Sequence, residues 1–149
     1  MSRRFALVFA LAAVPLAMSR LASADEKAEC SYLEIAASNS KAPAIDGELK
    51  PLEKKLKKPP FTSWNTFKKL SGGPVALGKQ KAESLKLAQG AASLLLRDRN
   101  DRRIDISVTI DGADGKRVLD NKQSMPAGDW SVWVHNVKDD GHILALTCK

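Results

Sequence analysis

Hydrophobic and polar residues alternate along most of the second half of the chain. The clearest stretch is 103–110, in which large aliphatic residues occupy every second position, at Ile104, Ile106, Val108 and Ile110. A period of two places one set of side chains on a buried face of a β-strand and the other set in solvent. Shorter stretches with this pattern predict further strands at 31–38, 66–71, 75–77, 82–87, 92–97, 116–122, 130–137 and 142–148.

Short polar segments rich in glycine, proline and aspartate separate these stretches and predict turns. They lie at 71–74, 111–115, 126–129 and 138–141. Glycine and aspartate adopt the backbone conformations that hairpins require, and proline interrupts the hydrogen-bond ladder of a strand. Many short strands joined by such turns predict a mainly β fold, either an antiparallel β-sandwich or a small barrel.

One segment has helical rather than strand periodicity. Leu49, Leu52 and Leu56 are spaced by three and four residues, which places them on one side of a short amphipathic helix. The side chain of Asp46 is placed to cap the first turn, and Pro59-Pro60 ends the helix. We expect this helix to plug one end of the β structure or to cover an edge.

The first 24 residues have the pattern of a secretory signal peptide. Arg3 and Arg4 precede an apolar run at 5–18, and Ala22-Ser23-Ala24 supplies small residues for cleavage. The run is shorter than the roughly 20 residues that a membrane-spanning helix needs. The sequence therefore predicts a cleaved leader at 1–24 and a single exported domain at 25–149, periplasmic or extracellular and without a transmembrane segment.

Two cysteines lie near the two ends of the predicted domain. Export would bring Cys30 and Cys148 into an oxidising compartment, where an even number of cysteines favours a disulfide. The alternative is two free thiols, one of them reactive, but the chain has no C-x-x-C motif. We expect a structural bridge between these two residues.

Positive charge is concentrated in one part of the chain. Residues 48–81 contain nine lysines and two glutamates, an excess of seven positive charges in a chain of net charge +7. Lysines interleaved with aromatic rings can hold anions while the rings stack on sugars or bases. The residues of such a site would be Lys54, Lys55, Lys57, Lys58, Phe61, Trp64, Phe67, Lys68 and Lys69. The alternative is a solvated helix surface above aromatic residues that belong to the core.

The chain has two histidines, and the last predicted hairpin brings them together. If Val137 lies opposite His142, His135 lies opposite Leu144, and the two histidines are diagonal neighbours on one face. Imidazoles are zinc ligands, although catalytic zinc usually takes three protein ligands. A metal-binding protein or metal-dependent enzyme using His135 and His142 is therefore a second hypothesis. Its alternative is two partly exposed strand histidines without a metal.

Motifs for covalent catalysis and for nucleotide binding do not occur in the sequence. There is no G-x-S-x-G motif and no glycine-rich phosphate loop, and the aspartates near 98–105 and 111–120 lack the spacing of a calcium loop. We therefore expect no cofactor, and a non-enzymatic accessory or binding domain of the cell envelope or extracellular space. Its expected partner is an anionic polymer or another protein rather than nucleic acid.

A set of short strings is spread over the predicted domain. They are Ala36-Ala37-Ser38-Asn39, Ile45-Asp46 with Leu49, Leu52 and Leu56, Pro60-Phe61, Phe67-Lys68-Lys69-Leu70, Pro126-Ala127-Gly128 and Gly141-His142-Ile143-Leu144-Ala145-Leu146. Together they resemble a family of small exported bacterial β-rich proteins of unassigned function. The resemblance covers most of 25–149 and implies one exported β-rich domain. It assigns no catalytic or binding residue.

Overall fold

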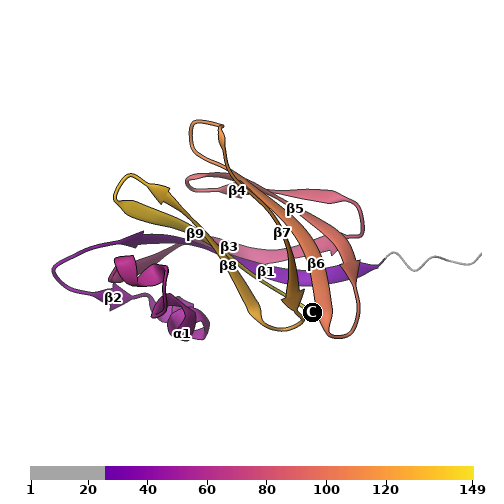
Figure 1. Cartoon of the computed structure of the whole chain (residues 1–149), viewed down its shortest axis with the longest axis horizontal. Coiled ribbons are helices and arrows are strands. Elements are labelled where there is room, and N and C mark those ends of the chain that lie inside the picture. Colours follow the sequence, from indigo (N-terminus) through magenta and orange to yellow (C-terminus); the bar gives the residue numbers. More distant parts are fainter. Residues whose placement is uncertain (1–25) are drawn as a thin grey trace, which may run out of the picture.

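A computed structural model describes residues 26–149, so the predicted leader at 1–24 lies outside the described residues. Strands dominate this part of the chain, with a short helical segment after the second strand (Figure 1). The strands are β1 (Lys27–Ser38), β2 (Ala44–Ile45), β3 (Thr66–Gly78), β4 (Ala82–Leu87), β5 (Gly90–Arg99), β6 (Arg103–Asp111), β7 (Arg117–Pro126), β8 (Trp130–Val137) and β9 (Asp140–Cys148). The helical turns are η1 (Gly47–Leu52), α1 (Glu53–Leu56) and η2 (Phe61–Ser63).

The strands form two sheets that pack face to face, which confirms the mainly β prediction in its sandwich form. One sheet has the order β2-β3-β1-β9-β8 and the other β4-β5-β6-β7. All neighbouring pairs are antiparallel except the two-residue contact of β2 with β3. The alternating aliphatic residues of β6 point between the sheets and are fully buried, as their period of two predicts.

A disulfide joins the two ends of the domain, as the sequence predicts. Cys30 in β1 lies directly opposite Cys148 in β9, and their Cα atoms are 4.0 Å apart. Both residues are buried in the core between the sheets. The bridge therefore joins two neighbouring strands through cysteines that are 118 positions apart in the sequence.

The helical segment packs on a face of the sandwich, whereas the sequence predicts a plug or an edge cover. Leu49, Leu52 and Leu56 join Ile35 and Ile143 in a second core, on the side of the five-stranded sheet that faces away from the other sheet (Figure 1). The spacing of the three leucines is therefore confirmed as one buried helical face. The central strands β1 and β9 are covered on both faces as a result.

The capping role predicted for the side chain of Asp46 is wrong. Its carboxylate accepts a hydrogen bond from the backbone N–H of Lys69 at 2.9 Å, and makes no cap bond to the helical segment. The backbone carbonyl of Asp46 instead accepts the N–H of Leu49 at 2.9 Å, which starts the first turn as a 3-10 helix. The carboxylate thus ties the helical segment to β3.

The predicted turn at 71–74 is also wrong, because β3 runs through it without interruption. A β-bulge near Glu34 shifts the register between β1 and β3. Position 72 favours glycine, because a Cβ there would lie only 2.9 Å from the backbone oxygen of Tyr32. β2 pairs only with Thr66 and Phe67, so β3 is the edge strand of the sheet at Pro74. Proline is tolerated on an edge strand, because no neighbouring strand needs its missing N–H.

A close contact beneath Trp64 gives a direct test of this packing. Gly141→Ala is expected to lower the free energy of unfolding by about 1–3 kcal/mol, because the new Cβ would lie 2.8 Å from the Trp64 ring. The ring cannot move freely, since its Nε1 donates a hydrogen bond to the Asp139 carbonyl at 2.9 Å. Gly47→Ala is the control, as no atom of the described part of the chain lies within 4 Å of its added Cβ. Equal thermal unfolding midpoints for the two variants would contradict the contact.

Candidate functional site

The lysines of the basic segment divide into paired and unpaired groups. Lys57 pairs with Glu53 at 2.5 Å, Lys55 with Asp129 at 3.6 Å, and Lys69 with Glu48 at 3.0 Å. The ion pairs found in residues 26–149 do not include Lys50, Lys54, Lys58 or Lys68. Since exposed pairs contribute only about 0–1 kcal/mol each, the paired lysines also remain available to a charged ligand.

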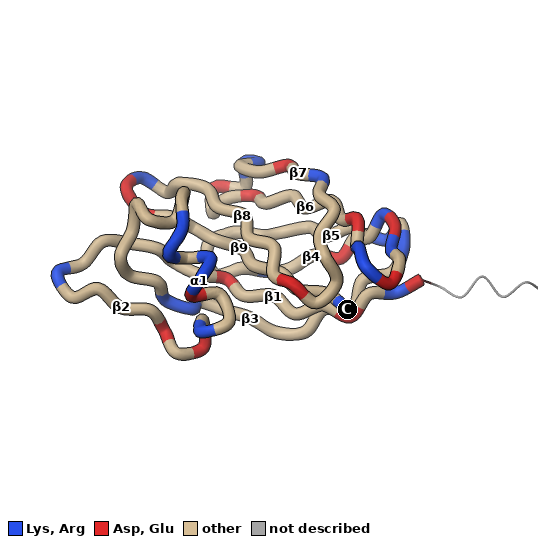
Figure 2. The backbone as a smooth tube through the Cα atoms, turned by 60° about the horizontal axis from the view of Figure 1, so that its bottom comes forward, with Lys and Arg blue, Asp and Glu red and all other residues tan. Residues whose placement is uncertain are grey.

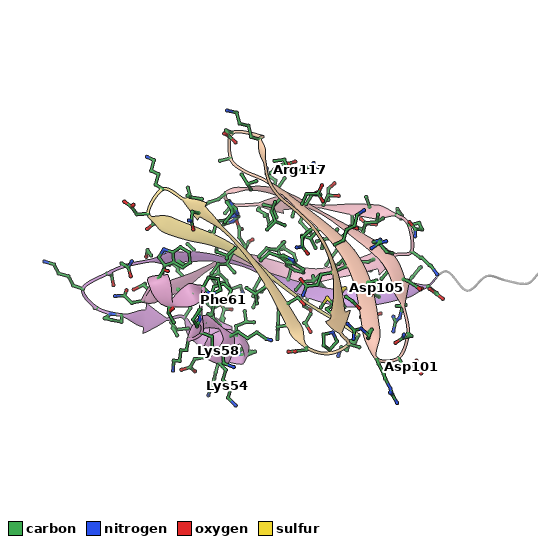
Figure 3. All side chains as sticks on the ribbon, viewed as in Figure 1. Lys54, Lys58, Phe61, Asp101, Asp105 and Arg117 are labelled. Carbon is green, nitrogen blue, oxygen red and sulfur yellow. A yellow bond between two sulfur atoms is a disulfide. The ribbon has the colours of Figure 1, made fainter. Side chains whose placement is uncertain are left out.

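Positive charge gathers on the helical segment. Between Glu48 and Lys58 there are five lysines against two glutamates, an excess of three charges. Figure 2 shows these Lys positions together along α1, whereas charges of both signs are mixed at the far end of the sandwich. Lys54 of α1 and Lys58, two residues after α1 ends, extend away from the strands (Figure 3). We call the exposed residues Lys50, Lys54, Lys57 and Lys58 the lysine surface.

The three aromatic residues of the predicted site lie beneath the lysine surface, in the core. Phe61, Trp64 and Phe67 are 8%, 9% and 4% exposed and pack with the leucines of the helical segment. Rings buried to this degree offer little area for stacking on a ligand. The lysines and the aromatic residues are therefore neighbours in space, but the rings pack in the core under the helical segment and do not form part of its exposed surface.

A groove opens beside the lysine surface. Its volume is about 630 Å³, and it lies between β2, the helical segment and the start of β3. Its lining includes the charged residues Lys50, Lys57 and Glu53 and the apolar residues Ile45 and Trp64. The hydrogen bond from Lys57 holds the pKa of the Glu53 carboxyl below its usual value, and the charges of Lys57 and Lys50 add to this effect. Glu53 is thus ionised at neutral pH and offsets part of the positive charge.

The structure brings the two histidines closer together than the predicted register does. His135 lies directly opposite His142, and Val137 pairs with Asp140, so the predicted pairing with Leu144 is wrong. The reason is a tighter turn in which only Lys138 and Asp139 connect the strands, with Lys138 at a φ of 59°. The two imidazole rings meet edge to face, with centroids 4.8 Å apart.

A buried glutamate completes this histidine cluster. Nε2 of His142 lies 2.7 Å from Oε1 of Glu34, and both side chains are fully buried. Because an ionised carboxylate only accepts hydrogen bonds, Nε2 of His142 carries the proton that is donated to Glu34. The Nδ1 atoms of His135 and His142 are buried and have no hydrogen-bond partner among residues 26–149.

Burial acts on both titratable neighbours of His142. Burial raises the pKa of Glu34, but the hydrogen bonds from Ser71, Ala88, His142 and Gln89 together lower it by more. The pKa of Glu34 therefore lies below its usual value. Burial lowers the pKa of His135, and the charge of a protonated His142 lowers it again. The cluster therefore favours an ionised Glu34 and a neutral His135 at neutral pH, on either side of His142.

The histidine cluster does not extend to a metal centre. Residues 26–149 contain no group of three or more His, Cys, Asp or Glu side chains arranged to hold a metal ion. The aspartates near 98–105 and 111–120 serve strand ends and turns instead: Asp98 pairs with Lys79, Asp111 pairs with Arg117, and Asp114 accepts the N–H of Lys116. Asp101 and Asp105 lie at different places along the β5–β6 hairpin (Figure 3).

Sequence reasoning missed Glu34. The alternation in 31–38 places Leu33, Ile35 and Ala37 on one buried face and therefore assigns Glu34 to solvent. The structure buries both faces of β1, because the four-stranded sheet covers one and the helical segment covers the other. No local signal in 31–38 marks this second buried face, because it depends on how distant segments pack on β1.

Comparisons with known proteins find no relative of this chain. No family model, no curated protein and no solved structure matches it. Among the described residues, no helix combines the length and hydropathy that crossing a bilayer requires.

Proposed function

We propose that the protein is an exported, non-enzymatic binding domain whose lysine surface binds an anionic polymer of the cell envelope or extracellular space. The observation that carries the proposal is the set of exposed lysines on the helical segment, three of which, Lys50, Lys54 and Lys58, have no ion-pair partner among residues 26–149. A local excess of charges of one sign raises the concentration of oppositely charged ligands near a surface. Export rests on the leader pattern at 1–24, and the buried disulfide is compatible with it.

The way the segment is held supports a rigid binding surface. Its leucines are buried in the second core, Lys55 pairs with Asp129 of the β7–β8 turn, and Asp46 binds the backbone of β3. Lysines on a fixed backbone lose less conformational entropy on binding than lysines on a mobile loop. The groove beside Lys50 and Lys57 gives space for part of a chain to lie against the segment.

Heparin chromatography of the domain at 25–149 tests the proposal with a defined polyanion. A Lys50→Glu/Lys54→Glu/Lys58→Glu variant is expected to elute at a clearly lower salt concentration than the wild type, because three favourable charges become repulsive. Salt screens such contacts, with a Debye length of about 10 Å at 0.1 M. The wild type is therefore expected to bind at low ionic strength and to be released as salt rises.

The control changes the net charge by the same amount elsewhere. Lys116, Lys122 and Lys138 are exposed residues outside the helical segment and form no ion pair among the described residues. Their replacement by glutamate is expected to reduce retention less than the variant of the lysine surface. Equal reductions would show that net charge, and not this surface, determines binding.

A further inference from the structure

The Glu34 carboxylate is saturated with hydrogen-bond donors. Ser71 Oγ lies 2.5 Å from Oε2, the Ala88 N–H donates to Oε2 at 2.8 Å, the Gln89 N–H donates to Oε1 at 3.0 Å, and His142 donates to Oε1 at 2.7 Å. Such charge-assisted hydrogen bonds are about twice as strong as bonds between neutral groups. Four donors aimed at one buried carboxylate compensate it for the loss of water.

These donors come from both sheets. Glu34, Ser71 and His142 belong to the five-stranded sheet, whereas Ala88 and Gln89 form the turn between β4 and β5 of the four-stranded sheet. Glu34 shares its face of β1 with Cys30 and Tyr32, which pack in the core between the sheets. The carboxylate therefore connects the two layers at the end of the sandwich opposite Cys30.

We infer that Glu34 is an acid-sensitive clamp: its ionised carboxylate holds the β4–β5 turn against the five-stranded sheet, and its protonation releases that turn. A protonated carboxyl group carries an O–H donor of its own and loses the charge that strengthens the other bonds. The two turn N–H groups are themselves donors, so neither can accept the new proton. The rest of the sandwich keeps its core and its disulfide when the turn opens.

The groups that face Glu34 determine the direction of the response. His142 faces it from β9, with His135 of β8 next to His142, and β3 contributes the Ser71 hydroxyl. The β4–β5 turn contributes backbone N–H groups. The clamped state holds the pKa of Glu34 below its ordinary value of 4.5. The clamp is thus fully formed above that value and weakens as pH falls through the lower pKa of the clamped state.

Amide hydrogen exchange measured by NMR from neutral to acid pH tests the clamp in the wild-type domain. The protection factors of the Ala88 and Gln89 N–H groups are expected to fall at least about tenfold as Glu34 is protonated. Those of Leu94 and Val108, in the middle of the same sheet, are expected to persist. A parallel fall at all four residues would overturn the inference, since it would report global unfolding.

Two variants separate the clamp from general acid sensitivity. In Glu34→Gln the Ala88 and Gln89 amides are expected to be weakly protected already at neutral pH and to show no further acid transition. Glu29→Gln, which changes an exposed glutamate on the same strand, is expected to behave as the wild type. Protection in Glu34→Gln equal to that of the wild type would overturn the inference.

The wild type alone can decide the question if Glu34→Gln does not fold. The carboxyl ¹³C shift of Glu34 and the amide proton shifts of Ala88 and Gln89 are expected to share one titration midpoint, below 4.5. Separate midpoints would show that the turn does not respond to Glu34.

Discussion

Replacing both bridged cysteines, in Cys30→Ala/Cys148→Ala, is expected to lower the free energy of unfolding by about 4–5 kcal/mol. The bridge closes a loop of 118 residues, and in the chain-entropy model a longer loop restricts the unfolded chain more strongly. Both sulfur atoms are buried between the sheets, so removing them also costs packing contacts. Denaturant unfolding monitored by tryptophan fluorescence measures the difference.

Reduction of the wild type provides the control for this variant. The reduced protein keeps both side chains and loses only the covalent link, so its destabilisation isolates the effect of the loop. We expect the unfolding midpoint of the reduced wild type to lie between those of the oxidised wild type and the double alanine variant, because the variant also loses the packing of the two sulfur atoms. A loss below about 1 kcal/mol in both would contradict a bridge that restricts the unfolded chain.

Glu34→Ala is expected to lower the free energy of unfolding by about 3–5 kcal/mol at neutral pH. The substitution leaves the buried N–H of His142 and the turn N–H groups of Ala88 and Gln89 without their acceptor. Each buried donor that loses its partner costs about 1–3 kcal/mol. Glu29→Ala, at an exposed position of the same strand, is expected to change stability by less than about 0.5 kcal/mol.

The stability difference between the wild type and Glu34→Ala is also expected to depend on pH. The folded protein lowers the pKa of Glu34, so the unfolded chain binds its proton more readily. The contribution of Glu34 is thus complete above the ordinary carboxyl value of 4.5 and is lost as pH falls through the folded pKa. Unfolding curves of both proteins should approach each other in acid, and a constant difference down to pH 3 would contradict this assignment.

The strands that are covered on one face were the easiest to predict. In β6, aliphatic residues alternate with polar ones, and the structure buries all four of the former. β1 departs from this pattern, because its second buried face carries a glutamate that the alternation assigns to solvent. Burial of that face depends on packing between distant segments, which local periodicity does not contain.

Turn residues predicted some connections and misled at others. The turn after β7 occurs as expected at Ala127 and Gly128. The Gly72-Gly73-Pro74 stretch lies within β3, because a bulge and a free sheet edge accommodate the residues that would otherwise break a strand. In the last hairpin, a connection of two residues in place of four changed which residues face each other, and this brought His135 opposite His142.

The candidate site was predictable in its charge but not in its geometry. The lysine excess can be counted in the sequence, and the exposed lysines of the helical segment match it. The roles of Phe61 and Trp64 could not be decided, because an aromatic residue near lysines has the same pattern whether it packs in a core or contacts a ligand. Their burial follows from the position of the helical segment on a sheet face, which no local pattern specified.

Binding of polyanions at the lysine surface is tested most directly by an NMR titration of the domain with a defined heparin oligosaccharide at low salt. The proposal predicts that amide shift changes concentrate at Lys50, Lys54, Lys57 and Lys58 and in the groove beside them, and that added salt reverses these changes. Shift changes centred on the four-stranded sheet, or no change at any residue, would contradict it.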